Sequence, residues 1–286
     1  MQKKNPLVKP YLKWAGGKRQ LLPEIKKYIP KQLNRLQYYE PFVGAGAVFF
    51  DAQPKRAVIN DYNSQLIMTY NTIVRNIDGL LEVLRMHRSN NSEKYFYEIR
   101  SQDRDAKAFA SLTNTEKSAR LIYLNKTCYN GLYRVNSQGL FNSPYGRYQN
   151  PAICDEPVLR AIHNYLSSNE NEIEISSEDF AVAVQTANHQ SFVYFDPPYH
   201  SPDNTNFTGY QADKFDDAEQ TRLRDTFADL TGRGVKCLLS NSDTKFIREL
   251  YANDEYDIIS VLAKRAINSD SAGRGNVNEV LIKNWR

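Results

Sequence analysis

The sequence lacks any run of about 18 apolar residues, the length that a membrane-spanning helix requires. Its first residues, MQKKNPLVKP, contain no apolar stretch of the kind found in a secretory signal. These two absences argue against a membrane protein and against an exported one. We therefore expect a cytoplasmic protein with no membrane partner.

Cysteine and histidine are also scarce. The three cysteines (Cys128, Cys154 and Cys237) are far apart in the chain, odd in number and form no CxxC pair. This pattern argues against a disulfide framework and against a structural zinc site. The four histidines show no spacing typical of metal ligands. We therefore expect no metal.

Neither sign of charge dominates, since 37 Lys and Arg residues stand against 33 Asp and Glu residues. The net charge of +4 is compatible with nucleic acid as a partner but does not identify it. Tyrosine is abundant instead, with nineteen residues, several of them beside Lys, Arg or Asn. A tyrosine offers a ring face for stacking and a hydroxyl for phosphate. The alternative is that most of these tyrosines are ordinary core and boundary residues, and for any single tyrosine that alternative is the better one.

The 286 residues are enough for one large domain or two modest ones. Short apolar runs alternate with helical periodicity at both ends of the chain, which predicts an α/β fold with a mostly parallel sheet covered on both sides. The expected strands are near residues 37–39 and at 56–61, 192–196, 235–241, 256–263 and 278–285. The last two are joined by a polar, glycine-containing loop and are expected to form an antiparallel hairpin at the sheet edge.

The middle of the chain has a different pattern. From residue 63 to about 151 the periodicity is mainly helical, and it ends in the loop-rich stretch NGLYRVNSQGLFNSPYGRYQNP. We interpret residues 63–154 as an inserted, mainly helical domain. Residues 1–62 and 155–286 then form the α/β domain.

The stretch PFVGAGAVF places two glycines at a strand-to-helix turn, where Gly44 and Gly46 allow a ligand to approach the backbone closely. Phe49 stands where a dinucleotide fingerprint requires a third glycine, so an ordinary tight turn is an equal alternative. Asp61 ends the next strand, 17 residues after Gly44, about where a carboxylate binds ribose hydroxyls in nucleotide-binding α/β folds. Its alternative role is that of an N-cap for the following helix.

The stretch KWAGGK at residues 13–18 precedes the first strand. Trp14 beside paired glycines, with Lys13 and Lys18 on either side, suits an aromatic wall next to an anionic or adenosine ligand. A surface turn with a buried tryptophan is the alternative, and on this stretch alone it is the better one.

The stretch VYFDPPYH runs from an expected strand into a carboxylate and two prolines, which a central strand does not tolerate. An exocyclic amino group on a nucleobase is a poor nucleophile because its lone pair is delocalised into the ring. The Asp196 carboxylate and the Pro197 carbonyl supply two acceptors for its hydrogens from a corner that Pro198 stiffens, and Tyr199 supplies a ring for stacking. This arrangement predicts preorganised electrostatic stabilisation of an amino group that reacts. A plain rigid turn is the weaker alternative.

Taken together, the motifs resemble the Dam family of DNA adenine methyltransferases over nearly the whole chain. The similar stretches include YLKWAGGKRQLLPEI, EPFVGAGAVFFD, NDYNSQLI, YNGLYRVNSQGLFNSPYGRY, VYFDPPY and LLSNSDT. Their order is that of the α group of amino-methyltransferases, with the methyl-donor motif first and the catalytic motif last. The chain looks closest to the GATC-recognising enzymes of restriction–modification systems.

The resemblance implies a Rossmann-like sheet, S-adenosylmethionine as cofactor, methyl transfer to adenine N6 in double-stranded DNA and base flipping into the DPPY site. It also implies that the inserted domain recognises the target sequence. The implied catalytic residues are Asp196, Pro197, Pro198 and Tyr199. The implied cofactor contacts are Trp14, Lys18, Phe42, Gly44, Gly46, Asp61, Phe180 and Asp196, with Phe180 expected on a strand in the segment 178–180. The implied DNA contacts are Lys13, Tyr129, Asn130, Leu132, Arg134 and Tyr148.

Elementary chemistry gives these DNA contacts a compatible role. An arginine such as Arg134 reads guanine O6 and N7 through two hydrogen bonds, and Leu132 suits a thymine methyl group. An aromatic residue such as Tyr129 suits the space that a flipped base leaves behind. A simple turn at Asn130-Gly131 with a solvated Arg134 is an equal alternative for this stretch taken alone. Ser143 departs from the family, which usually has Val there.

Two other classes of protein remain as alternatives. A DNA-binding protein that has lost catalysis is disfavoured by the intact DPPY and KWAGGK motifs. A nicotinamide-dependent oxidoreductase is disfavoured by the incomplete glycine fingerprint. The sequence leaves open whether a cognate restriction endonuclease acts on the same site, with which no stable complex would be expected, and it leaves the oligomeric state open.

Overall fold

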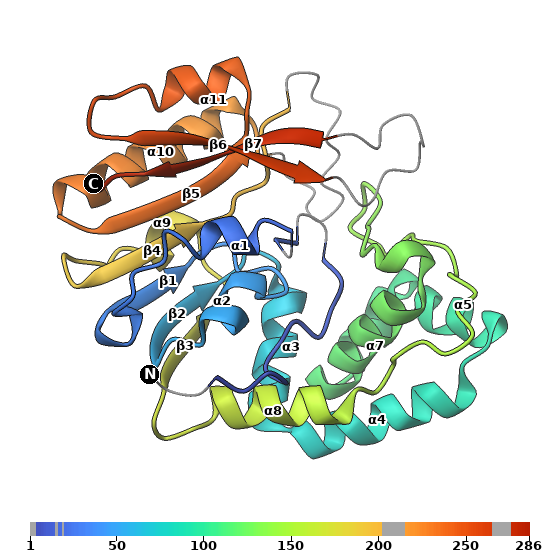
Figure 1. Ribbon diagram of the computed structural model, residues 1–286. Helices are drawn as coiled ribbons and strands as arrows, with labels where there is room; N and C mark the ends of the chain where they lie inside the picture. Colours follow the sequence, from blue (N-terminus) through green and yellow to red (C-terminus); the bar gives the residue numbers. More distant parts are fainter. Residues whose placement is uncertain (1–3, 15–16, 19, 202–214, 265–275) are drawn as a thin grey trace.

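The computed structural model describes residues 4–14, 17–18, 20–201, 215–264 and 276–286. One sheet of seven strands runs through the α/β part of the molecule in the order β3-β2-β1-β4-β5-β7-β6 (Figure 1). The strands are β1 (Gln37–Glu40), β2 (Arg56–Asn60), β3 (Glu172–Ser176), β4 (Ser191–Phe195), β5 (Lys236–Ser242), β6 (Asp257–Lys264) and β7 (Asn276–Lys283).

Six of the strands run in the same direction, whereas β7 runs antiparallel to its neighbours β5 and β6. The predicted α/β class with an antiparallel edge hairpin is confirmed. The loop that joins the two hairpin strands, residues 265–275, lies outside the described residues.

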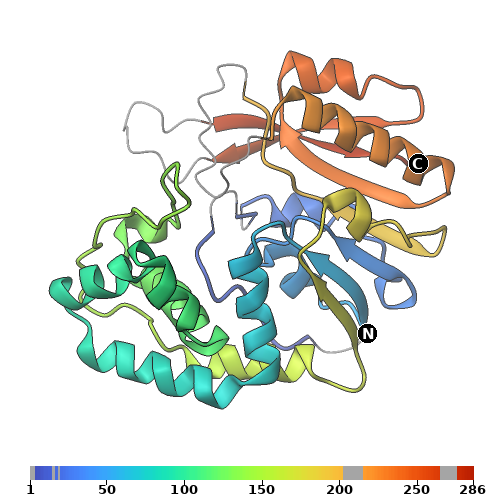
Figure 2. The ribbon, with the colours of Figure 1, turned by 180° about the vertical axis from the view of Figure 1, so that it is seen from behind.

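Both faces of the sheet are covered. Successive strand residues point to opposite faces, so the adjacent Tyr38 and Tyr39 of β1 belong to two different hydrophobic clusters. The cluster of Tyr38 includes residues of α1 (Leu22–Ile25), α2 (Ala47–Ala52), α3 (Ser64–Arg75) and α8 (Glu156–Leu166). The cluster of Tyr39 includes residues of α9 (Phe180–Ala183), α10 (Asp217–Gly232) and α11 (Lys245–Leu250). The two views from opposite sides show the resulting layers (Figures 1 and 2).

The predicted helical stretch between β2 and β3 forms several helices beside the β3 edge of the sheet (Figure 1). Besides α3 and α8, they are α4 (Ile77–Asn90), α5 (Glu93–Ser101), α6 (Ala106–Ser111) and α7 (Asn114–Thr127), with short 3-10 turns at 102–104 and 129–131. Polar side chains mark their starts: Asn63 caps α3, Asn76 caps α4, Ser92 caps α5 and Thr113 forms a capping box with Glu116 at α7.

These helices share a hydrophobic core with the sheet. α3 packs against β3 and α8 on one side and against α7 on the other. Tyr70 of α3, Leu121 of α7 and Phe192 of β4 belong to one continuous buried cluster. The helical part is therefore anchored to the sheet through apolar packing, and its role as a separate domain with the boundaries 63–154 stays a prediction.

Among the helices of the described residues, none is long and apolar enough to cross a bilayer.

Candidate active site

The carboxyl ends of β1, β2 and β4 meet at one edge of the sheet, because these strands are parallel neighbours. The strand order reverses direction between β1 and β4, which is where ligands bind in open α/β sheets. The Gly44–Gly46 turn follows β1, Asp61 follows β2 and Asp196 follows β4. The sheet thus brings three separate sequence motifs to one place.

Asp61 holds the glycine turn through its carboxylate. Its Oδ2 atom accepts a hydrogen bond from the Gly44 backbone N–H at 2.9 Å, and its Oδ1 atom accepts one from the Asn63 N–H at 2.9 Å. Burial raises the pKa of Asp61 to about 6, against the lowering effect of these two donors, and the nearby Asp196 adds to the rise. The alternative role of Asp61 as the helix cap is wrong, because Asn63 accepts the capping hydrogen bond from Leu66.

Trp14 connects the glycine turn with the helical part of the molecule. A Cβ atom on Gly44, whose φ is +50°, would lie 3.1 Å from Cδ1 of the indole, so glycine allows the ring to rest on the backbone. The indole also stacks on Tyr133, with ring centroids 5.2 Å apart. The Trp14 ring therefore lies between the glycine turn and Tyr133 of the helical part. Ala15 and Gly16 of the same motif lie outside the described residues.

Asp196 lies at the centre of the site. Its Oδ1 atom is 2.7 Å from Lys18 Nζ and accepts a hydrogen bond from the Ser240 hydroxyl at 2.9 Å. Burial raises the pKa of Asp196, and the Lys18 ammonium and the Ser240 hydroxyl oppose that rise. The Asp196 side chain keeps 18% of its surface exposed, against 7% for Lys18. The carboxylate is thus held firmly and still accessible.

The residues that follow Asp196 are fixed by side chains from other elements. The Gln220 side chain of α10 donates from Nε2 to the Pro198 backbone carbonyl at 2.9 Å, and the Asn241 side chain of β5 donates to the Oε1 atom of Gln220 at 3.0 Å. The hydroxyl of Tyr199 donates to Glu279 of β7 at 2.8 Å. Lys18 Nζ lies 4.3 Å from the centroid of the Tyr199 ring, in a cation–π contact. The corner is rigid because of these partners and not only because of its prolines.

The segment 178–180 follows β3 and starts α9, so its expected position on a strand is wrong. Asp179 caps that helix and forms two hydrogen bonds to Arg222, at 2.9 and 2.7 Å. Phe180 is buried, with the Arg222 guanidinium 4.0 Å from its ring centroid and the Phe42 ring 5.3 Å away. Phe42 and Phe180 therefore form one aromatic patch beside the glycine turn.

Several residues of this site have no counterpart among the sequence predictions: Glu40, Gln220, Ser240, Asn241 and Glu279. Glu40, at the end of β1, accepts a hydrogen bond from the Tyr38 hydroxyl at 2.5 Å, and burial raises its pKa well above the usual range. Two signals in the sequence were available. Gln220 shares the apolar face of α10 with Leu223 and Phe227, and Ser240-Asn241 interrupt an apolar strand. A polar residue at such a position is buried and needs a partner.

The predicted DNA contacts lie in or beside residues 129–148, which we call the recognition segment. Tyr129 is 56% exposed, in a 3-10 turn where Asn130 and Gly131 have positive φ. Lys13 packs along Gly131, and its Nζ atom lies 5.4 Å from the Tyr148 ring centroid. The turn predicted at Asn130-Gly131 is thus present, and it presents Tyr129 outward.

Arg134 begins a short antiparallel hairpin. The Asn142 N–H donates to the Arg134 carbonyl at 2.9 Å, and the Asn142 side chain accepts from Arg134 Nε at 2.9 Å. The hairpin is anchored to the helices because the Phe141 N–H donates to Asp103, which forms an ion pair with the buried Arg120 at 2.9 Å. Arg134 is exposed, and its hydrogen bond to Asn142 uses the Nε atom and not the two Nη atoms.

Ser143, the departure from the family pattern, lies at the base of the same hairpin. Its hydroxyl donates to the Leu132 carbonyl at 2.5 Å, so it links the two arms beside the predicted contact Leu132.

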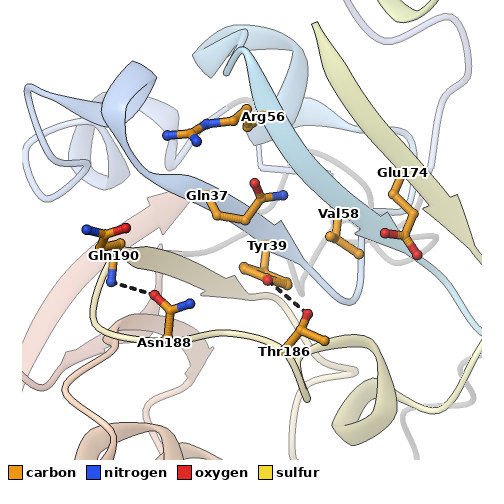
Figure 3. Close-up of a pocket in the computed structure, with 8 residues that line it drawn as sticks. All are labelled: Gln37, Tyr39, Arg56, Val58, Glu174, Thr186, Asn188 and Gln190. Atoms are coloured by element: carbon orange, nitrogen blue, oxygen red, sulfur yellow. Dashed lines mark hydrogen bonds between the residues drawn. The ribbon is translucent and has the colours of Figure 1, made fainter.

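A polar hollow of about 370 Å³ lies elsewhere on the sheet (Figure 3). Gln37 and Arg56 line it from the amino ends of β1 and β2, so it is at the opposite end of the strands from Asp196. The close-up shows Tyr39 hydrogen-bonded to Thr186 and the Arg56 side chain directed away from the other lining residues (Figure 3). The hollow is therefore separate from the site at the carboxyl ends of the strands.

Comparison with known proteins gives a consistent result. Residues 14–267 match the family described as D12 class N6 adenine-specific DNA methyltransferase. The type II methyltransferase M1.LlaDCHI of Lactococcus lactis subsp. cremoris is 42% identical, over 100% of this chain and 98% of its own. The type II methyltransferase M.MjaIII of Methanocaldococcus jannaschii is 40% identical, over 97% and 99%.

More distant relatives carry a different name. The DNA adenine methylase of Escherichia coli K12 is 33% identical, over 95% of this chain and 93% of its own. Among solved structures, an rRNA methyltransferase of Streptomyces viridochromogenes is 11% identical, over 92% of this chain and 83% of its own, with a TM-score of 0.36, which is too low to support an argument. The family match spans most of the chain and includes the glycine turn, Asp61 and Asp196. The chain belongs to the D12 class of N6 adenine-specific DNA methyltransferases.

Proposed function

We propose that this methyltransferase binds double-stranded DNA at GATC, flips the target adenine out of the duplex and holds its amino group at the corner formed by Asp196 and Pro197. The class of reaction follows from the family: a methyl group passes from S-adenosylmethionine to N6 of adenine in DNA. When bound, the cofactor supplies an electrophilic methyl group on a sulfonium ion. The residues described above determine where the adenine and the cofactor would lie.

Asp196 and the Pro197 carbonyl are the acceptors for the two hydrogens of the N6 amino group. Hydrogen bonds from both hydrogens draw the nitrogen toward tetrahedral geometry and localise its lone pair for attack. The observation that carries this assignment is that the carbonyls of Pro197 and Pro198 differ in their hydrogen bonding. Gln220 occupies the Pro198 carbonyl, whereas within the described part of the chain no donor reaches the Pro197 carbonyl. Tyr199, held by Glu279, supplies the ring on which the base stacks.

The residues at the glycine turn fit S-adenosylmethionine. A carboxylate has about four lone-pair sites, and the backbone donors Gly44 and Asn63 fill only two of those on Asp61. Burial raises the pKa of Asp61 to about 6, and further donors would favour its ionised form. The two hydroxyls of a ribose would supply such donors. We assign Trp14, Lys18, Phe42, Gly46 and Phe180 to the same proposed cofactor site.

The recognition segment and the helices that carry it, within residues 63–154, are the proposed target-recognition domain. Arg134, with Nε fixed by Asn142, directs its Nη atoms at a guanine, and Leu132 contacts a thymine methyl group. Tyr129 fills the space that the flipped adenine leaves. Lys13, Asn130 and Tyr148 contact the DNA beside it. A guanine and a thymine read in this way are consistent with GATC.

The names of the relatives described above extend the proposal to a biological setting. Two of them are called type II methyltransferases. We therefore place this enzyme beside a cognate restriction endonuclease that cuts the same sequence when it is unmethylated, without a stable complex between the two proteins.

The experiment that tests the proposal is methylation of short duplexes with labelled S-adenosylmethionine. We expect incorporation into a GATC duplex and little into duplexes that differ at one base pair. A GATC duplex with N6-methyladenine already present on both strands is the control and should accept no label. Equal incorporation into all unmethylated duplexes would contradict GATC specificity, and label on a base other than adenine would contradict the assignment of the site.

A further inference from the structure

Ser240 lies directly beside Asp196 although the two are far apart in the sequence. β4 and β5 are parallel, with Tyr194 opposite Leu238 and Phe195 opposite Leu239. The next residues along the two chains, Asp196 and Ser240, are therefore also opposite each other. Ser240 is fully buried, in a strand whose neighbouring residues Leu238 and Leu239 are also fully buried. A hydroxyl in such a place costs free energy unless it has partners.

The hydroxyl of Ser240 has two close partners. Its Oγ atom lies 2.9 Å from Asp196 Oδ1 and 2.9 Å from the Tyr194 hydroxyl. The Phe195 carbonyl, at 3.4 Å, is a more distant acceptor. An ionised carboxylate only accepts hydrogen bonds, so Ser240 must donate its single proton to Asp196. Tyr194 must then donate to Ser240, and the direction of both hydrogen bonds is determined.

Tyr194 is suited to this role because it remains a donor over the whole working range of pH. Its side chain is fully buried, and burial raises the pKa of its hydroxyl well above the usual value. The two hydrogen bonds therefore have one direction: Tyr194 donates to Ser240, and Ser240 donates to Asp196.

The two oxygens of Asp196 are consequently not equivalent. Oδ1 receives Lys18 at 2.7 Å and Ser240 at 2.9 Å, which together account for its two lone-pair directions. Oδ2 has no hydrogen-bond donor among the residues that the structure describes. Since 18% of the side-chain surface is exposed, the carboxylate still reaches the open side of the site.

We propose that Ser240 is a positioning residue for methyl transfer: its hydroxyl, oriented by Tyr194, binds Asp196 Oδ1 and thereby turns Oδ2 toward the amino group of the target adenine. This inference rests on the proposed role of Asp196 as an acceptor. Ser240 itself does not touch the substrate. A purely structural serine at this place in β5 would affect stability and leave the methyl-transfer step unchanged.

The Ser240 hydroxyl also favours the ionised form of Asp196. The amino group needs that ionised form, so the rate of methyl transfer falls as the pH drops below the pKa of Asp196. Removing the hydroxyl raises that pKa, and the acidic limb of the rate profile must move to higher pH. This shift is a readout that a structural role does not produce.

The test is the single-turnover rate of methyl transfer to a GATC duplex, measured against pH with saturating S-adenosylmethionine. The variants Ser240→Thr and Ser240→Val introduce side chains of nearly the same shape, but only the threonine keeps a hydroxyl group. We expect Ser240→Val to be slower by roughly 10- to 100-fold, the usual effect of one hydrogen bond to a charged group, with its acidic limb at higher pH. Ser240→Thr should keep most of the rate, and the dissociation constants for DNA and cofactor should stay nearly unchanged in both.

Ser118→Ala is the matched control. Ser118 is also fully buried, and its hydroxyl pairs with Thr72 at 2.9 Å, between α3 and α7 and away from the corner. It should lose stability without any change in rate or in the acidic limb. If the larger side chains prevent folding at position 240, Ser240→Ala and Tyr194→Phe replace them, and each should lower the rate and move the acidic limb.

The inference is overturned if the Thr and Val variants have the same rate, or if Ser240→Ala and Tyr194→Phe keep the wild-type rate and acidic limb. Asp196→Asn separates this result from a failure of the proposed function. If Asp196→Asn is inactive while Ser240→Ala behaves as wild type, only the role of Ser240 is wrong. If Asp196→Asn keeps the full rate, the proposed role of Asp196 is itself wrong.

Discussion

Asp196 and Arg134 are both charged residues that we propose to meet the DNA, and their surroundings differ. Asp196 is held by Lys18 and Ser240, two side chains that are themselves buried. Arg134 is exposed and has one side-chain partner, Asn142, within the part of the chain that the structure describes. The hairpin that carries Arg134 is anchored through its backbone rather than through the arginine.

The difference matches the tasks that we propose for the two regions. A corner that stabilises a transition state has to be in place before the reaction, and buried partners provide that rigidity. A segment that reads bases approaches from solvent and adjusts to the duplex, so it presents exposed side chains on a fixed backbone. Substitutions at the corner should therefore change the rate, and substitutions in the recognition segment should change affinity and specificity.

The largest effect is expected for Asp196→Ala. Loss of one preorganised partner of the reacting group costs roughly 10²- to 10³-fold in the rate constant. DNA affinity should be unchanged, because the recognition segment is intact. Single-turnover methylation and a binding isotherm on the same duplex measure both. A variant with near wild-type turnover would remove Asp196 from the mechanism.

Asp61→Ala should weaken cofactor binding rather than slow the transfer step. A lost carboxylate–hydroxyl pair costs about 1.5–3 kcal/mol, or roughly a 10- to 150-fold rise in the dissociation constant for S-adenosylmethionine. The pKa of Asp61, raised to about 6, adds a pH dependence with a definite sign. The carboxylate accepts hydroxyl donors only when ionised, so affinity should fall as the pH drops through about 6.

Calorimetry from pH 5 to pH 8 measures both effects. Asp61→Asn is the control for the pH dependence, since an amide does not titrate, and its affinity should be low and flat. Equal affinities of the wild type at both ends of this range would show that the ionised carboxylate does not hold the cofactor.

Arg134→Ala should change the preference among sequences. Loss of a bidentate contact to guanine costs roughly 1–3 kcal/mol of discrimination at one base pair. Arg134→Lys keeps the charge but not the planar fork, so it should also relax specificity while keeping more of the affinity. Competition between GATC and single-substitution duplexes gives the ratio of rates. If that ratio is the same in the wild type and in Arg134→Ala, Arg134 does not read sequence.

The smallest effect is expected for Arg147→Ala. Arg147 is exposed and close to Tyr148, with Glu93 at 3.4 Å as an ionic partner. A phosphate contact at this position predicts uniformly weaker binding to every sequence and a salt dependence whose logarithmic slope is shallower by about 1. Binding isotherms at several salt concentrations test it. An unchanged slope would place Arg147 outside the DNA contact.

The sequence was sufficient for the parts of the site that consist of local patterns. Asp196 stands at a strand end because two prolines follow it, and Gly44 stands at a turn because a strand precedes it and a helix follows. The α/β class with its antiparallel edge followed from the same periodicities. Family resemblance then supplied the roles.

The sequence was not sufficient where distant residues meet. Ser240 and Glu279 reach the corner only because β5 lies beside β4 and β7 lies beside β5, which no local pattern specifies. The sequence offers Asp61 as an alternative cap of α3, but Asn63, two residues later, caps the helix. The Asp61 carboxylate instead accepts from the Gly44 and Asn63 N–H groups. Phe180 was expected on a strand, but Asp179 starts a helix there and Arg222 fixes it. In each case a tertiary contact decided the outcome.

The separation of chemistry from recognition is tested most directly by one set of single-turnover rates. Asp196→Ala and Arg134→Ala are each compared with the wild type on a GATC duplex and on duplexes that differ at one base pair. We predict that Asp196→Ala lowers every rate by the same factor and leaves the ratios between duplexes unchanged, while Arg134→Ala narrows the ratio at one base pair and keeps the rate on GATC within a small factor. Equal changes in rate and in ratio for both variants would contradict this separation.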